Sequence, residues 1–161
     1  MELASRFKDR GDKVTIVRCT GQLRSCLVNP KHNRLICASC KSKYQKAIEL
    51  SGLTDVNVIS LPLNNYSYDE IPESFANIEK LKAFKFQGVD LGISVVSTLV
   101  SRFNKDHKFD TVKHKKEVFT ELKMCVDIYI GLEQILAEIK PEEVYFFNGR
   151  FSSYNPLKCC V

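Results

Sequence analysis

Long hydrophobic runs are absent from this sequence. No apolar stretch approaches the roughly 20 residues that a helix needs to cross a bilayer. The opening residues, MELASRFKDRGDK, lack the apolar core of a secretory signal peptide, and no internal repeat or low-complexity segment is visible. We therefore expect a protein of the cytoplasm.

A concentrated block of one charge is also absent. The formal net charge is +5, but the basic residues are spread among acidic ones rather than gathered in an arm or a stripe. We therefore expect no nucleic-acid partner. The 161 residues, 44% hydrophobic and 27% charged, have the composition of a single globular domain, which excludes a disordered chain, collagen and a small disulfide scaffold.

Cysteine, in contrast, is plentiful. Four of the seven cysteines fall within residues 19–40, at Cys19, Cys26, Cys37 and Cys40. In a reducing compartment they are thiols, and their odd total cannot close entirely into intrachain disulfides. The Cys37-x2-Cys40 pair has the chelate spacing of a tetrahedral zinc ion, whereas the first pair is unusually wide. The pattern is consistent with a structural zinc site or with four unlinked thiols, and a redox dithiol or iron–sulfur cluster is the third interpretation.

A histidine and a further cysteine have two interpretations each. His32 lies between the two cysteine pairs, where it either replaces one zinc ligand or is an ordinary exposed loop histidine. Cys125 falls on the apolar side of a helical pattern, which favours a small core residue over a nucleophile.

The first part of the chain alternates between helical and strand patterns. The expected elements are a helix that ends at Gly11, a strand over 13–19, a helix from Cys37 or Cys40 to Gly52, and a strand over 56–61. This order is that of an α/β fold with a parallel sheet. A strand before the first helix is missing from the pattern, so we expect an incomplete N-terminus.

The second part is richer in helix. We expect a modest helix around 78–84, a turn or short extended piece over 86–90, a helix over 92–103, a basic loop over 104–116, a long amphipathic helix over 118–139 packed on a sheet, and a buried parallel strand over 144–147. In open α/β sheets, ligands bind beyond the carboxyl ends of the strands.

Asn148, Gly149 and Arg150 follow the last expected strand directly. Glycine lets backbone amides approach a ligand, and arginine can hold a carboxylate, a phosphate or sugar oxygens. The tripeptide therefore predicts a site for a polar, oxygen-rich ligand, with a tight turn and a surface salt bridge as the alternative. The segment Cys19–Gly21 ends an earlier strand, so it is expected to border the same cleft.

Taken together, the segments GDKVTIVRC, CLVNPKHNRLICASC, QGVDLGISVVSTLVSR and PEEVYFFNGRFS give the chain a likeness to a known group. It resembles the glycosyltransferase-like proteins encoded in bacterial capsule and surface-polysaccharide gene clusters. The resemblance implies the N-terminal half of a GT-B fold: one Rossmann-like, three-layer domain over 1–161 with a mainly parallel sheet, lacking its first strand and carrying a cysteine-rich insertion at 19–40.

The same resemblance implies a role. The N-terminal half of such enzymes receives the acceptor, a sugar or a lipid-linked saccharide, and Asn148, Gly149 and Arg150 would face the cleft. The protein would associate with the membrane polysaccharide machinery at the inner face of the membrane. A C-terminal half, missing here, would hold the nucleotide-sugar donor. We therefore expect a truncated or split protein that does not transfer sugar by itself.

Two questions stay open at this point. Transfer needs a base near the acceptor hydroxyl, and His32, Glu70, Asp90 and His107 are all candidates without a distinguishing pattern. The alternative function, from a different class, is a zinc-stabilised module that binds a protein or nucleic-acid partner without catalysis. A thiol redox protein centred on Cys37 and Cys40 is a third hypothesis.

Overall fold

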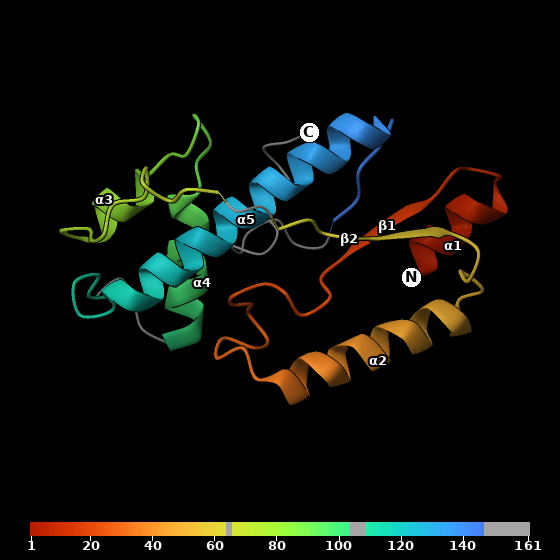
Figure 1. Cartoon of the computed structure of the whole chain (residues 1–161), viewed down its shortest axis with the longest axis horizontal. Coiled ribbons are helices and arrows are strands. Elements are labelled where there is room, and N and C mark those ends of the chain that lie inside the picture. Colours follow the sequence, from red (N-terminus) through yellow and green to blue (C-terminus); the bar gives the residue numbers. More distant parts are fainter. Residues whose placement is uncertain (64–65, 104–108, 147–161) are drawn as a thin grey trace.

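The computed structural model describes residues 1–63, 66–103 and 109–146. Its elements are α1 (Glu2–Asp9), β1 (Thr15–Arg18), α2 (Arg34–Leu50), β2 (Asn57–Ser60), α3 (Ile78–Lys82), α4 (Gly92–Phe103) and α5 (Lys115–Ile139). We call residues 1–63 the sheet half, and residues 66–103 with 109–139 the helical half (Figure 1). None of the helices in these ranges is both long and apolar enough to cross a membrane.

The sheet half is a parallel β–α–β unit. β1 and β2 are hydrogen-bonded in parallel, with Thr15 opposite Asn57 and Arg18 opposite Ser60, and α2 makes the crossover. The fold is therefore α/β, as predicted. In the described ranges the sheet has two strands only, which is less than a three-layer Rossmann-like domain requires.

The two strands lie between α2 and α5 (Figure 1). On one side the Arg18 guanidinium lies 5.0 Å from the ring centre of Tyr44 in α2. On the other side Ile59 and Leu61 pack against apolar side chains of α5, including Met124. The expectation that the long amphipathic helix packs on a sheet holds for this part of α5.

A pair of asparagines determines where α2 begins. Asn33 is the N-cap, and its side chain accepts a hydrogen bond from the Leu35 amide. The Asn33 amide donates to Asn29 Oδ1 and the Asn29 amide group donates to the Asn33 carbonyl, each at 2.8 Å. The predicted start at Cys37 or Cys40 was therefore too late, because this asparagine cap satisfies the first turn.

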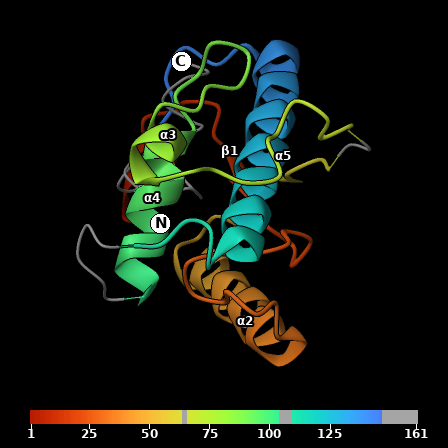
Figure 2. The same ribbon diagram turned by 90° about the vertical axis from the view of Figure 1, so that its left-hand side faces the viewer.

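The helical half has a core of its own. Figure 2 shows α3 and α4 beside α5, and their buried apolar side chains form one cluster that includes Leu81, Leu99 and Leu122. Gly92, the first residue of α4, passes so close to α3 that a Cβ there would lie 1.8 Å from the Leu81 carbonyl oxygen. Gly131 in α5 likewise admits the Pro62 carbonyl, 2.5 Å from where a Cβ would be.

Two predictions beyond these helices have different outcomes. The turn over 86–90 is confirmed: Phe86 pairs with Val89 around Gln87 and Gly88, both with positive φ. The predicted strand over 144–147 is wrong for residues 144–146, where no strand is formed. Tyr145 is 58% exposed, and its ring lies 5.0 Å from that of Phe7 in α1, so the tyrosine of this apolar run packs on a helix.

Candidate functional site

The site predicted from the sequence falls partly outside the described residues. Asn148, Gly149 and Arg150 belong to residues 147–161, and His107 belongs to residues 104–108. The carboxyl end of β1, which the sequence placed at the same cleft, is described. The geometry of the site is therefore built from that strand end and from α2.

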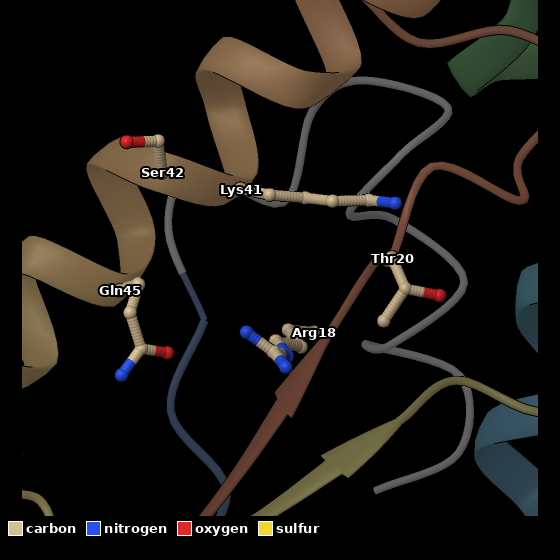
Figure 3. Close-up of a pocket in the computed structure, with 5 residues that line it drawn as sticks. All are labelled: Arg18, Thr20, Lys41, Ser42 and Gln45. Atoms are coloured by element: carbon tan, nitrogen blue, oxygen red, sulfur yellow. The ribbon is translucent and has the colours of Figure 1, made fainter.

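A cavity of about 420 Å³ lies between the end of β1 and α2 (Figure 3). It is lined by Arg18, Thr20, Lys41, Ser42 and Gln45. It occupies the position that parallel α/β units use for ligands, beyond the carboxyl end of a strand. Thr20 belongs to the segment expected to border a cleft. The contribution of α2 was missed, because the predicted helix began at Cys37 or Cys40 and gave no indication of which of its faces meets the strand.

The cavity is cationic. Among the described residues that line it, Arg18 and Lys41 are the charged ones, and none of them carries a carboxylate. Figure 3 shows Lys41 reaching from α2 toward Thr20, with the Arg18 guanidinium between the strand and the helix. The arrangement can hold an anionic group between two positive side chains, with the Thr20 hydroxyl beside them (Figure 3).

Two polar atoms beside this cavity lack partners. Within the described ranges, Arg18 Nε and the Tyr44 hydroxyl are buried and make no hydrogen bond. Burial raises the pKa of Tyr44, against the smaller lowering effect of Arg18, so its hydroxyl is neutral near pH 7. Buried donors without partners are costly in a folded protein, and these two lie where β1 and α2 contact each other.

The loop after β1 is held by Gln22. Its Oε1 accepts hydrogen bonds from the Thr20 amide at 2.5 Å and from the Thr20 hydroxyl at 2.7 Å. Its Nε2 donates to the Leu61 carbonyl at 2.9 Å, just past the end of β2. Gly21, with φ of 90°, passes so close to α2 that a Cβ would lie 3.3 Å from Lys41 Cε. The strand end is thereby fixed against α2.

Three of the four clustered cysteines each accept a hydrogen bond from an N–H group. Cys19 Sγ accepts from the Gly21 amide at 3.2 Å, and Cys26 Sγ accepts from the Asn29 amide at 3.1 Å. Cys37 Sγ accepts from Asn29 Nδ2 at 3.2 Å.

The thiols influence one another but do not form a closed metal site. Burial raises the pKa of the Cys26 thiol, and the nearby thiols of Cys19 and Cys37 raise it further. Cys40 is exposed, and all four are free thiols. Among the described residues, no three histidine, cysteine or acidic side chains are grouped so that they could hold a metal ion. Cys125 is buried in α5, in agreement with the prediction of a core residue.

The cysteine-bearing loop is tied to the helical half by buried polar groups that the sequence reading missed. Ser25 Oγ donates to Glu121 Oε1 at 2.9 Å, and Arg102 forms an ion pair with the same carboxylate. Glu121 is 0% exposed. Its spacing offered a signal, since it lies three residues after Val118 and four before Cys125, on the apolar stripe of the helix.

A second tie lies one to two turns further along α5. Arg24 is 3.6 Å from Asp127, and the Tyr68 hydroxyl donates to the same carboxyl group at 2.5 Å. Burial raises the pKa of Asp127.

The remaining candidates for a base lie elsewhere. Glu70 accepts from the Tyr66 hydroxyl at 3.1 Å, and Asp90 pairs with Lys85 at 3.2 Å. Neither they nor His32 line the cavity, so among the described candidates the structure brings no base to this site.

Comparison of the chain with family models, with curated proteins and with solved structures finds no match in any of the three.

Proposed function

We propose that this chain is the acceptor-side domain of a glycosyltransferase-like protein in bacterial surface-polysaccharide synthesis. In this proposal the described β1–α2–β2 unit belongs to the Rossmann-like N-terminal half of a GT-B fold. The intact protein would move a sugar from a nucleotide-sugar donor to an acceptor hydroxyl, and the donor would bind a C-terminal half. The chain by itself would bind acceptor in the cytoplasm, at the membrane, without turnover.

One observation carries this proposal. A polar cavity lies at the carboxyl end of a strand in a parallel β–α–β unit, where α/β folds bind their ligands. Its hydroxyl and amide side chains, Thr20, Ser42 and Gln45, offer the donors and acceptors that sugar hydroxyls require. The sequence resemblance is the reason for proposing a saccharide ligand, and the cavity is the position at which we propose that it binds.

Binding of neutral saccharides tests the proposal. We would titrate the full chain with a panel of neutral mono- and disaccharides and follow its amide resonances by NMR. We expect shifts centred on Thr20 and α2 for at least one saccharide. Ser42→Ala should weaken that binding about threefold to tenfold by removing one hydrogen bond, whereas Ser39→Ala, an exposed serine on the same helix, should not.

Transfer activity provides the second half of this test. We would incubate the chain with UDP-glucose and each saccharide and measure released UDP. We expect no release, because the donor-binding half is not part of the proposed domain. Release of UDP would contradict an acceptor-only role, and a panel without any binding saccharide would contradict the function.

A specific observation favours the alternative, a zinc-stabilised binding module. Cys19, Cys26 and Cys37 each accept an N–H hydrogen bond, and such donors stabilise thiolates in metal sites. A zinc ion would have to draw these thiols and Cys40 together from their present positions.

Metal analysis tests this alternative. Protein purified without chelator should contain about one zinc per chain if the module is zinc-stabilised. Four thiols should then resist titration until denaturant is added, whereas a metal-free chain with all exposed thiols reactive would exclude it. Salt-sensitive binding to nucleic acid without any affinity for saccharides would favour the module over the glycosyltransferase domain.

A further inference from the structure

We propose that the cavity at the end of β1 is a phosphate subsite, in which Arg18 and Lys41 bind the phosphate or diphosphate group of a phosphate-linked saccharide. The saccharide part of this inference rests on the function proposed above, whereas the anion-binding part does not. The subsite would make the charged linkage, rather than the sugar ring, the first thing that the domain recognises.

Arg18 contacts an aromatic ring but forms no ion pair with any of the described residues. Its guanidinium lies over the Tyr44 ring, 5.0 Å from the ring centre, a cation–π contact that helps to hold the side chain in place. Its Nε is buried without a hydrogen-bond partner among the described residues. A phosphate group in the cavity would meet the terminal N–H groups, because the guanidinium fork matches two phosphate oxygens.

Lys41 supplies a second positive charge at the same cavity. None of the ion pairs among the described residues involves Lys41 or Arg18. Gly21 leaves room for the lysine stem, since any Cβ there would approach Lys41 Cε to 3.3 Å. Two cations that line one cavity and have no ion-pair partner among the described residues repel each other, so an anion between them would remove a cost as well as add contacts.

The rest of the cavity suits a phosphate with an attached group. The Thr20 hydroxyl, which donates to Gln22, can still accept a hydrogen bond from a sugar hydroxyl. A volume of about 420 Å³ falls within the roughly 300–1,000 Å³ of small-molecule sites and exceeds the needs of a lone phosphate ion.

Calorimetric titration of the full chain with inorganic diphosphate tests the anion site. We expect one ion bound per chain, with an affinity that falls as salt is added. Arg18→Gln and Lys41→Gln should each weaken binding about tenfold. Lys43→Gln is the matched control, because Lys43 is an exposed lysine of the same helix that does not line the cavity, and it should change the affinity less than twofold.

Two further variants separate binding from folding. Arg18→Lys keeps the charge and loses the fork, so it should bind with an affinity between those of the wild type and Arg18→Gln. Tyr44→Phe keeps the aromatic ring under the Arg18 guanidinium and removes only the hydroxyl. Unfolding midpoints of all variants would be measured, and equal diphosphate affinity in wild type, Arg18→Lys and Lys41→Gln would overturn the proposal.

Competition experiments identify the source of the phosphate. Glucose 1-phosphate represents a soluble sugar phosphate, and phosphatidylcholine vesicles carrying geranylgeranyl diphosphate represent a lipid headgroup. The probe that displaces inorganic diphosphate from the wild-type chain identifies the source. Phosphatidylcholine vesicles without the diphosphate lipid are the control and should displace none. Displacement by neither probe would overturn the phosphate subsite even if neutral saccharides bind, whereas diphosphate binding without any saccharide binding would overturn only the function proposed above.

Discussion

The helical half buries its apolar side chains in a core of its own, whereas the sheet half leaves several of them exposed. In α4, Val95 and Leu99 are fully buried, while in α2, Leu35 is 79% exposed and Leu50 is 86% exposed. α1 buries no residue, and α2 buries only Ile48. Because buried apolar area is the main source of stability, the helical half supplies most of the stability of the described chain.

The cavity and the clustered thiols all belong to the less buried half. That half is held to the rest by the packing of Ile59 and Leu61 on α5 and by polar ties, among them Arg24 to Asp127 and Ser25 to Glu121. Regions with few buried contacts open at lower free-energy cost than a core. The comparison indicates that the cavity and the clustered thiols lie in the part of the chain that can adjust most easily, with the helical half as the support.

The largest expected effect comes from the group that joins the two halves. Glu121→Ala leaves the Arg102 guanidinium, with 15% of its side chain exposed, without its carboxylate in a buried setting. We expect unfolding free energy to fall by about 3–5 kcal/mol, measured by urea denaturation. Glu138→Ala, at an exposed position of the same helix, should change it by less than about 0.5 kcal/mol.

Hydrogen exchange would show whether this cluster serves both halves. If it does, amides of β1 and β2 lose protection in Glu121→Ala along with those of α5. Protection that is lost in α5 alone would break the comparison, because the sheet half would then be stable without the tie.

Gly92→Ala tests the tight packing inside the helical half. The new methyl group would meet the Leu81 carbonyl oxygen, a backbone atom that cannot rotate away. We expect a loss of about 2–3 kcal/mol in thermal or urea unfolding. Ser101→Ala, an exposed position of α4, should be close to neutral, and equal stability of both variants would contradict the close contact between α3 and α4.

Asp127→Asn has a smaller effect with a definite pH dependence. Burial raises the pKa of this carboxyl group in the folded state, so the folded chain binds more protons than the unfolded chain over the range between the two pKa values. The contribution of Asp127 to stability is therefore fully present below the unfolded pKa and is lost as pH rises through the folded pKa.

The asparagine variant does not ionise and should be more stable than wild type by up to about 1 kcal/mol at pH 7. That advantage should shrink as pH falls through the folded pKa, in urea titrations repeated across pH 3–7. An advantage that grows toward low pH would show that the Arg24 and Tyr68 contacts outweigh burial at this carboxylate.

The smallest effect is expected on the exposed face of α2. Leu50→Ala should change the unfolding free energy by no more than about 0.5 kcal/mol, whereas Leu99→Ala in α4 should cost about 2–5 kcal/mol. Both substitutions remove the same atoms, so the difference between the two unfolding curves measures the contrast between the halves directly. Equal losses would mean that the Leu50 side chain of α2 is buried in solution.

Local patterns in the sequence were sufficient for most elements. α4 has the predicted bounds of 92–103, and the periodic stripe of α5 starts within three residues of the prediction. The start of α2 was missed because it depends on Asn29 and Asn33 bonding to each other. The apolar run at 144–146 has the composition of a buried strand, but composition does not specify which element it will contact.

The cavity was less accessible to sequence reasoning than the fold. Thr20 was expected near a cleft because it follows a strand, and that reasoning uses neighbouring residues only. Lys41 lies more than twenty positions from Arg18, and their meeting depends on how α2 packs against β1. Nothing in the charge pattern distinguishes Lys41 from Lys43, although only the former lines the cavity.

The position of Asn29 has a consequence for the chemical ageing of the protein. Its side-chain amide donates to the Asn33 carbonyl and to Cys37 Sγ, so deamidation to aspartate would remove both donors and place a carboxylate next to a thiol. Asparagine usually deamidates when the following backbone nitrogen attacks its side chain. Here that nitrogen belongs to Pro30, which carries no N–H, and the capped entry to α2 is therefore protected against this form of damage.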